Sequence, residues 1–377
     1  MRGLCPCSRL TPGFGSPSLE PFSTAALKVC YFGTYERAYP RNAQVISCLR
    51  GAGVEVEEEH VAVWDGARDG WTAGPGRALR LAAAEARLLT RRPQADAFLV
   101  GYPGHLDLAA ARRAARGRPV VFNPLVSLAD TLVGDRGRFR PSSLPARVLE
   151  RVDRHAFGAA DLVVADTQVH AHYLAQLAGR DDVAVCFVGA EERIFHPSWR
   201  QPPRFTALFV GKLIPLQGVE TILAAARLAS EITFRIVGSG QLQPLLEQRP
   251  PNVEYVPWVE YERLADEIRS AGCALGIFGA TPKAQRVIPN KVFQALACAA
   301  PVVTADTAAA RELLADGESA LLVPAADPGA LAEAICRLAT DAPLAERIAA
   351  GGRAVYERAA SEAVLGRRWR ELIVGLL

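Results

Sequence analysis

The stretch Ala207-Leu-Phe-Val-Gly211-Lys212-Leu-Ile-Pro-Leu-Gln-Gly218 decides the fold that we expect for this sequence. Its first four residues are apolar and predict a strand buried on both faces, as in a parallel sheet. A glycine and a lysine follow the strand, and Gly218 precedes an apolar helical run that begins near Val219. Backbone N–H groups converge at such a turn, and the helix dipole favours negative charge. The stretch therefore indicates a parallel α/β sheet with a candidate phosphate site at its edge.

Short apolar strands alternate with helical runs throughout the rest of the chain. The strands expected in the first half are residues 28–33, 54–63, 97–101, 120–123, 162–165 and 183–188. Those expected in the second half are residues 207–210, 233–237, 253–256, 274–278, 302–304 and 320–323. Such alternation predicts parallel sheets with helices on both faces and ligands at the carboxyl ends of the strands. We expect the α/β class, with two Rossmann-like parallel-sheet domains facing each other across a cleft.

A proline-rich run at residues 197–204 separates the two halves and is typical of an exposed linker. The expected units are a disordered extension at 1–26, an N-terminal acceptor-side domain at 27–198, a C-terminal nucleotide-sugar-binding domain at 199–358, and a C-terminal helix at 359–377. For the last helix, packing back on the N-terminal domain is one alternative.

Composition excludes several function classes. The chain has 377 residues, 22% of them charged, and a formal net charge of +3. A nucleic-acid-binding protein usually carries a stronger basic bias, so nucleic acid is not an expected partner. No apolar run reaches the ~20 residues that span a bilayer, and residues 1–26 do not resemble a secretory signal, so we expect a cytoplasmic protein. The six His and eight Cys show no zinc-binding spacing, and no metal site is expected.

Lysine is rare: Lys28, Lys212, Lys283 and Lys291 are the four lysines, against 39 arginines. Two of the four fall in the run 278–297, which leaves an apolar strand and enters an apolar helix. Clustered cations usually form a solvated face. Because apolar elements flank them here, we expect the cations to line a cleft.

Three segments of the second half carry a resemblance to a known family. They are Gly211–Gly218, Gly238-Ser-Gly240, and the run 289–303 (PNKVFQALACAAPVV). In this order and spacing they resemble the donor-binding half of family 4 glycosyltransferases, which are retaining enzymes of the GT-B fold. The segments 165–168 and 188–197 are similar to signatures at the end of that family's first domain. The resemblance covers roughly residues 27 to 375.

The resemblance implies a nucleotide diphosphate sugar, of UDP or GDP type, as donor substrate and no cofactor. The implied donor-binding residues are Gly211, Lys212, Gly238, Gly240, Lys283, Arg286, Asn290 and Gln294. Gln294 matches the second glutamate of the family's E-x7-E motif and Arg286 matches the first, so both acids are absent. Gln217 stands where the family commonly has a second cation.

The implied catalytic residues are His105, Lys212 and Arg286. Cations aimed at developing charge stabilise a transition state, and Lys212, Lys283 and Arg286 would stabilise the leaving diphosphate without a metal. His105 resembles the histidine that the family places at the donor sugar, although a structural histidine is the alternative. The expected acceptor-side residues are Gly33, Tyr35, Arg37, Arg41, His105 and Asp107, with Tyr39 as a second aromatic.

The resulting hypothesis is a bacterial-type glycosyltransferase that transfers a sugar to an unknown acceptor with retention of configuration. The alternatives are a sugar-nucleotide-binding protein without turnover and a GT-B-fold sugar-nucleotide epimerase. A further question concerns the basic stretch of Arg136, Arg138, Arg140, Arg147, Arg151 and Arg154. The preferred interpretation of this stretch is a solvent-exposed loop and helix face. The alternative is a peripheral contact with the anionic inner face of a membrane.

Overall fold

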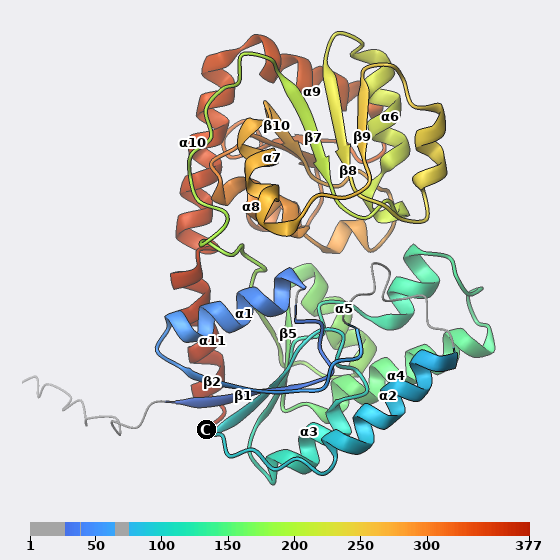
Figure 1. Ribbon diagram of the computed structural model, residues 1–377, viewed down its shortest axis with the longest axis vertical. Helices are drawn as coiled ribbons and strands as arrows, with labels where there is room; N and C mark the ends of the chain where they lie inside the picture. The colour runs from blue at the N-terminus through green and yellow to red at the C-terminus, as the bar shows by residue number, and fades with distance from the viewer. Residues whose placement is uncertain (1–26, 38, 65–74) are drawn as a thin grey trace, which may run out of the picture.

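A computed structural model describes residues 27–37, 39–64 and 75–377. The extension expected at residues 1–26 lies outside the described residues. Two sheet-centred domains lie one above the other, with the N-terminal domain at the bottom of Figure 1 and the C-terminal domain at the top. Both sheets are parallel throughout the described strands, so the α/β class is confirmed.

The N-terminal sheet has the strand order β2-β1-β3-β4-β5-β6. Its strands are β1 (Lys28–Gly33), β2 (Glu55–His60), β3 (Ala97–Val100), β4 (Val120–Phe122), β5 (Leu162–Ala165) and β6 (Val183–Val185). Its helices are α1 (Pro40–Gly51), α2 (Pro75–Leu88), α3 (Leu108–Ala115), α4 (Leu144–Ala159) and α5 (Gln168–Ala178). A π-helical turn, η1 (Asp130–Asp135), follows β4. Helices α3, α4 and α5 cover one face of the sheet and α1 covers the other.

The C-terminal sheet has the order β12-β11-β10-β7-β8-β9. Its strands are β7 (Thr206–Val210), β8 (Thr233–Val237), β9 (Val253–Val256), β10 (Cys273–Leu275), β11 (Val302–Ala305) and β12 (Leu321–Val323). Its helices are α6 (Val219–Leu228), α7 (Leu264–Ser270), α8 (Asn290–Ala297), α9 (Pro328–Thr340) and α10 (Ala342–Ala359). Short 3-10 turns lie at η2 (Pro215–Gln217), η3 (Gln243–Gln248), η4 (Tyr261–Arg263), η5 (Ala284–Arg286) and η6 (Ala310–Glu312).

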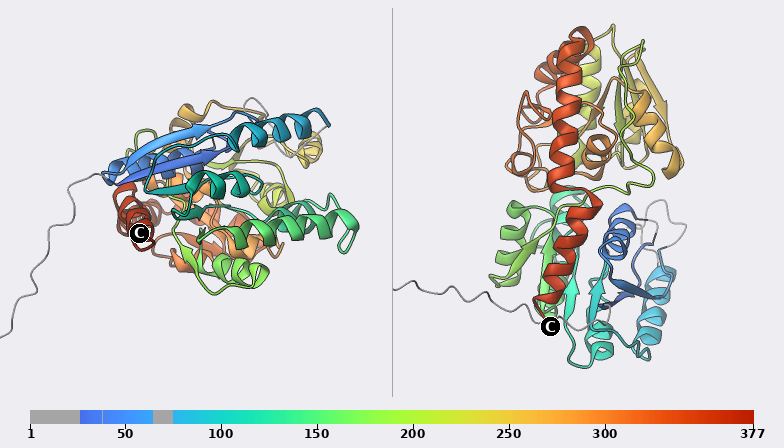
Figure 2. Two further views of the ribbon diagram at one scale, coloured as in Figure 1. Left: turned by 90° about the horizontal axis from the view of Figure 1, so that it is seen from below. Right: turned by 90° about the vertical axis from the view of Figure 1, so that its left-hand side faces the viewer.

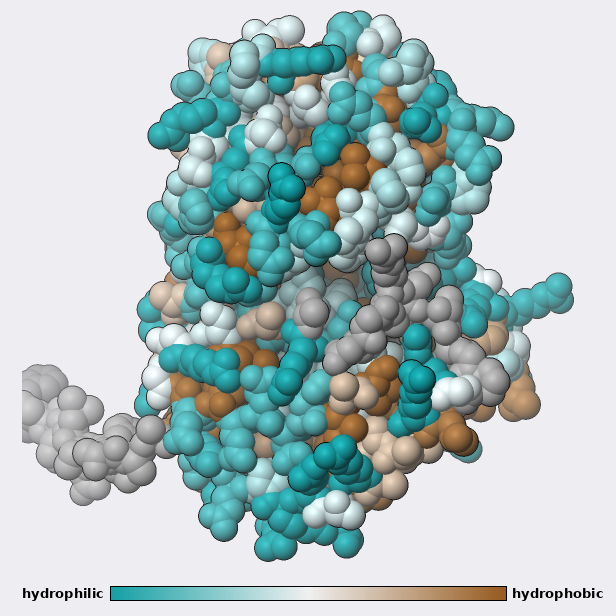
Figure 3. Space-filling view, viewed as in Figure 1, coloured by the Kyte–Doolittle hydropathy of each residue, from teal (hydrophilic) through white to brown (hydrophobic). Residues whose placement is uncertain are grey.

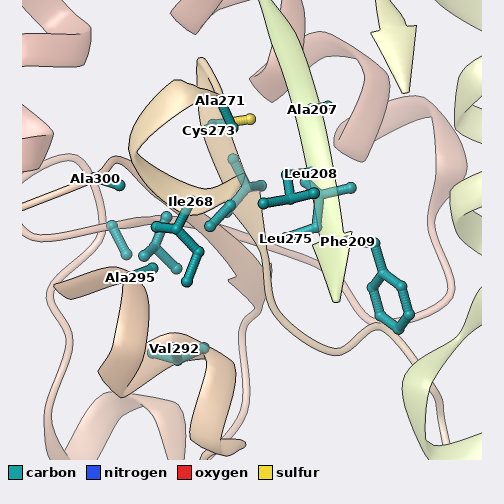
Figure 4. Close-up of a cluster of buried hydrophobic side chains, with 14 of the residues drawn as sticks. Ala207, Leu208, Phe209, Ile268, Ala271, Cys273, Leu275, Val292, Ala295 and Ala300 are labelled. Atoms are coloured by element: carbon teal, nitrogen blue, oxygen red, sulfur yellow. The ribbon is translucent and has the colours of Figure 1, made fainter. Parts of the chain in front are cut away.

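Apolar side chains from strands and helices fill the C-terminal core. Figure 4 shows Leu208 on β7 and Leu275 on β10 beside Ile268 of α7 and Val292 of α8. All four side chains are buried. Because β7 and β10 are neighbouring central strands, this packing fixes where their carboxyl ends lie, and it fixes the start of α8 relative to them.

The last two helices connect the two domains. Helix α10 packs on the C-terminal domain, and α11 (Glu362–Val374) continues downward beside the N-terminal domain, as the right-hand view of Figure 2 shows. Helix α11 packs against α1, and its Leu365, Trp369 and Ile373 are buried in the N-terminal core. The Arg41 guanidinium lies 5.5 Å from the centre of the Trp369 ring. The N-terminal domain is therefore built from two separate parts of the chain.

Candidate functional site

A cavity of about 310 Å³ lies between the domains, where the carboxyl ends of strands from both sheets meet. The C-terminal domain lines it with Gly211, Lys212, Gln217, Tyr261, Lys283, Asn290, Lys291 and Gln294, among others. The N-terminal domain lines it with Tyr39, Tyr102, Thr131, Asp135, Arg136 and Asp166, among others. Most of the predicted donor-binding residues of the C-terminal domain therefore line this one cavity.

Two glycine turns lie close together at the ends of β7 and β8, and of these glycines Gly211 lines the cavity. A Cβ on Gly238, which has a φ of +144°, would lie 1.9 Å from the carbonyl oxygen of Gly211. A Cβ on Gly240 would lie 2.6 Å from the carbonyl oxygen of Leu213. Only glycine lets the ends of β7 and β8 approach this closely. The close approach leaves room for a second pocket of about 230 Å³, lined by Lys212 and both of these glycines.

Helix α8 presents its first turn to the main cavity. Pro289 precedes the helix with an extended backbone, so the helix begins at Asn290. The first N–H groups of a helix have no partner within it, and the dipole there attracts anions. Asn290 and Gln294 both line the cavity, four residues apart on one side of the helix. Their proposed roles in donor binding stay predictions.

Lys283 lies in the wall where the domains meet. Its Nζ donates a hydrogen bond of 2.7 Å to Thr131 Oγ1 of the N-terminal domain. Burial lowers the pKa of Lys283, and the charges of Asp130 and Asp135 act in the opposite direction. Asp135 is buried, and neither carboxylate oxygen has a hydrogen-bond partner among the described residues. Burial raises the pKa of Asp135, while the nearby Lys283 cation partly offsets that rise.

The side chain of Arg286 lies against residues of the N-terminal domain. Its Nη2 lies 2.6 Å from Asp130 Oδ1, and its guanidinium lies 4.1 Å from the centre of the Tyr173 ring. Arg286 does not line the cavity. The side chain of Arg286, at the end of η5, is thus directed into a contact between the domains, and its catalytic role stays a prediction.

His105 is buried in the N-terminal domain. The ring is buried between Phe122 and Phe157, and its Nδ1 lies within hydrogen-bond distance of the Pro103 carbonyl. Nε2 lies 3.1 Å from the Val126 carbonyl oxygen. The histidine is not among the residues that line the cavity, and its role at the donor sugar stays a prediction.

Two of the predicted acceptor-side residues belong to the domain core. Tyr35 is fully buried, and its hydroxyl donates a hydrogen bond of 2.8 Å to Glu58. Arg41 is fully buried, and its guanidinium donates to the carbonyl oxygens of Cys186 and Phe187. Both polar groups are thus satisfied inside the protein and neither residue lines the cavity, so their acceptor contacts stay predictions.

The remaining acceptor-side residues form a local structure around β1. Asp107 is fully buried and accepts hydrogen bonds from the N–H and the hydroxyl of Thr34. A Cβ on Gly33 would lie 2.1 Å from the same carboxylate, so this glycine is required for packing. Arg37 is exposed and forms a 3.0 Å ion pair with Glu58. None of the three lines the cavity; among the predicted aromatics, Tyr39 does.

Sequence reasoning assigned no binding role to Lys291, although it expected the cations of residues 278–297 to line a cleft. Lys291 is 8% exposed and lines the cavity beside Gln217. The scarcity of lysine drew attention to the run that contains it, but its position on an apolar helix resembles a core position. Asp135 follows a strand in the manner of many surface loops, and its burial depends on the opposite domain.

Comparison with known proteins identifies the second half of the chain. Residues 204–341 match the family described as glycosyl transferases group 1. A D-inositol 3-phosphate glycosyltransferase 2 of Catenulispora acidiphila is 30% identical, over 54% of this chain and 52% of its own. A phosphatidyl-myo-inositol mannosyltransferase of Mycobacterium leprae is 33% identical over 40% of this chain and 41% of its own length. The chain thus spans about half the length of the first of these curated relatives and 41% of the second, and the expected likeness of its second half to glycosyltransferases is confirmed.

Solved structures confirm the GT-B fold. Sucrose-phosphate synthase from Thermosynechococcus elongatus superposes with a TM-score of 0.72 at 16% identity, covering 93% of this chain and 99% of its own. Anabaena HepE in complex with UDP-glucose superposes with a TM-score of 0.68 at 16% identity, covering 93% and 100%. At this identity the likeness concerns the fold alone.

Proposed function

From the glycosyl transferases group 1 domain at residues 204–341, we propose that the chain transfers a hexose from a nucleotide diphosphate sugar to an acceptor, with retention of configuration. The observation that carries the proposal is that Gly211, Lys212 and the start of α8 meet at one interdomain cavity, while Gly238 and Gly240 line a smaller pocket that shares Gly211 and Lys212 with it. Backbone N–H groups, a helix N-terminus and cations are the groups that bind a diphosphate.

During transfer, negative charge develops on the leaving diphosphate, and these groups would stabilise that charge. Lys212 lines both the main cavity and the smaller pocket beside Gly238, so its ammonium can meet a phosphate while the nucleoside occupies the pocket. Donors fixed before the reaction stabilise a transition state at no reorganisation cost. The acceptor would enter from the N-terminal side, where Tyr39 and Asp135 line the cavity.

The test is transfer by the full chain from UDP- and GDP-hexoses. Because relatives are named for inositol phosphate and phosphatidylinositol acceptors, the acceptor panel includes both compounds. The anomeric configuration of the product, read by NMR coupling constants, tests retention. Binding without transfer or donor hydrolysis would favour a sugar-nucleotide-binding protein. Interconversion of the hexose while it stays on the nucleotide would favour an epimerase.

We further propose that α4 contacts an anionic membrane surface. Leu144 is 76% exposed and Val148 is 52% exposed, and Arg147 and Arg151 are exposed beside them on the same helix. Figure 3 shows apolar residues at the lower right of the molecule, in the region where Figure 1 places α2 and α4. Cations beside exposed apolar side chains suit the headgroup region of an anionic bilayer. Among the described helices none is both long and apolar enough to cross a membrane.

A further inference from the structure

Lys291 is a buried cation with uncharged partners. It lies in the first turn of α8 and is 8% exposed. Its Nζ lies 2.5 Å from Gln217 Oε1, 3.3 Å from the Gly276 carbonyl oxygen, and 3.6 Å from the centre of the Phe209 ring. No carboxylate of the described residues forms an ion pair with it. An isolated buried ammonium is unfavourable unless something supplies the missing negative charge.

The ammonium lies directly against the wall of the cavity. A Cβ on Gly211 would be 2.9 Å from Lys291 Nζ and 3.6 Å from Gln217 Oε1. Lys291 and Gln217 both line the cavity, as does Gly211. Because Gly211 has no side chain, a short path remains between a ligand in the cavity and the buried nitrogen.

We propose that Lys291 binds the diphosphate of the donor and takes up a proton from solvent when the diphosphate enters the cavity. This inference rests on the proposed function, because it assigns a new ligand to the same donor site. A phosphate oxygen would supply the counter-charge that the free protein lacks, while Gln217 holds the side chain in place. Lys291 would be a binding residue for the leaving group rather than a core residue.

The electrostatics support proton uptake at this position. Burial alone lowers the pKa of Lys291 well below its usual value. An opposite charge within a few ångströms favours the charged form, so an incoming diphosphate raises that pKa again. The other charged groups lining the cavity are Lys212 and Lys283 on the same side and Asp135, Arg136 and Asp166 on the opposite side. Lys283 differs from Lys291 because it contacts Thr131 and lies near Asp130 and Asp135.

Calorimetry of the full chain with UDP and with GDP tests the proposal. Titrations in buffers of different ionisation heat, repeated at several pH values at which the diphosphate stays ionised, measure the protons taken up on binding. We expect the unmodified protein to take up a proton and to bind more weakly as the pH rises. Lys291→Met should weaken binding by about 10-fold or more and abolish the uptake, since it removes a charge-assisted contact.

Two variants separate this role from a structural one. Lys28→Met is the matched control: Lys28 lies on β1, pairs with Glu57, and should leave binding unchanged. Gln217→Lys combined with Lys291→Gln exchanges the two side chains, returns an ammonium to the same wall, and should recover most of the affinity. The melting temperature of ligand-free Lys291→Met should be unchanged or higher, since an apolar side chain replaces a buried amine that has no charged partner.

The outcomes distinguish the two proposals. If the unmodified protein binds neither UDP nor GDP, the proposed function and this inference both fail. If it binds a diphosphate but Lys291→Met binds with equal affinity and equal proton uptake, only the inference about Lys291 fails. A loss of binding that the exchanged double variant does not recover, accompanied by a lower melting temperature, would also overturn it.

Discussion

Arg286 of the C-terminal domain and Asp130 of the N-terminal domain form an ion pair between the domains, with 2.6 Å between Nη2 and Oδ1. Both side chains are largely buried, at 15% and 10% exposed. Around them, Thr167 Oγ1 donates to the Arg286 carbonyl oxygen, and Glu312 accepts hydrogen bonds from the first N–H groups of α5. Contacts between charged and polar groups thus hold the two domains together on one side of the cavity.

The first prediction uses this ion pair. Arg286→Ala and Asp130→Ala should lower turnover to a similar extent, and the double variant should be no worse than either single variant. In a double-mutant cycle on unfolding, contacting residues couple by about 0.5–3 kcal/mol. If Arg286 instead contacts the diphosphate, Arg286→Ala would raise the donor KM and lower kcat, while Asp130→Ala would preserve both.

The second prediction concerns the close approach of two turns. Gly238→Ala would place a methyl group 1.9 Å from a backbone oxygen, which cannot move aside as a flexible side chain could. Gly53→Ala is the matched control, because Gly53 also has a positive φ, +76°, but a Cβ added there would have nothing within 4 Å among the described residues. Denaturant unfolding should show the control losing about 1–2 kcal/mol and Gly238→Ala losing more. Equal losses would contradict the predicted clash.

The third prediction follows from the carboxyl pair Glu85 and Asp107. Burial raises the pKa of Glu85, and its hydrogen bond with Asp107 raises it further. Above the ordinary glutamate range and below the raised pKa, unfolding releases a proton, so stability falls as pH rises, by up to about 1.4 kcal/mol per pH unit. Glu85→Gln should flatten this slope, while Glu150→Gln, at a more accessible position on α4, should not. Identical slopes in all three proteins would refute it.

The fourth prediction tests the exposed side of α4. The full chain should sediment with vesicles that contain anionic lipid, and less so as salt screens the charges. Arg147→Glu with Arg151→Glu should weaken this binding, at about 1 kcal/mol for each lost cation. Arg347→Glu with Arg358→Glu changes the same charge at exposed positions of α10 and serves as the control. If both double variants bind like the unmodified chain, α4 is a solvated helix.

The sequence predicted the α/β fold because strands buried on both faces form nearly continuous apolar runs, such as Thr206–Val210. It also placed Gly211 and Gly238 correctly at the ends of strands, since glycine after a strand marks a tight turn. The alanine-rich run at residues 308–315 forms only the 3-10 turn Ala310–Glu312. A run of alanines favours a helix locally, but tertiary contacts decide its length.

Several predicted site residues lie away from the cavity, because their polar side chains are satisfied inside the fold. Arg41, Tyr35 and Asp107 follow or precede strands just as ligand-binding residues do. What separates them is a partner distant in sequence, such as Phe187 for Arg41 and Thr34 for Asp107. The binding role proposed for Lys291 could not be predicted from the sequence for the same reason. Whether its side chain reaches the cavity depends on Gly211 and Gln217, which belong to another strand-to-helix turn.

The packing of α11 on α1 has a consequence for the order of synthesis. The buried Trp369 completes the N-terminal core, yet the ribosome makes residues 199–358 before it makes this tryptophan. The C-terminal sheet, with β12 as its last strand in sequence, can form while α11 is still being translated. The half of the protein that is made first is therefore the half that finishes folding last. Premature termination near residue 360 would leave Arg41 and the apolar side of α1 without their cover.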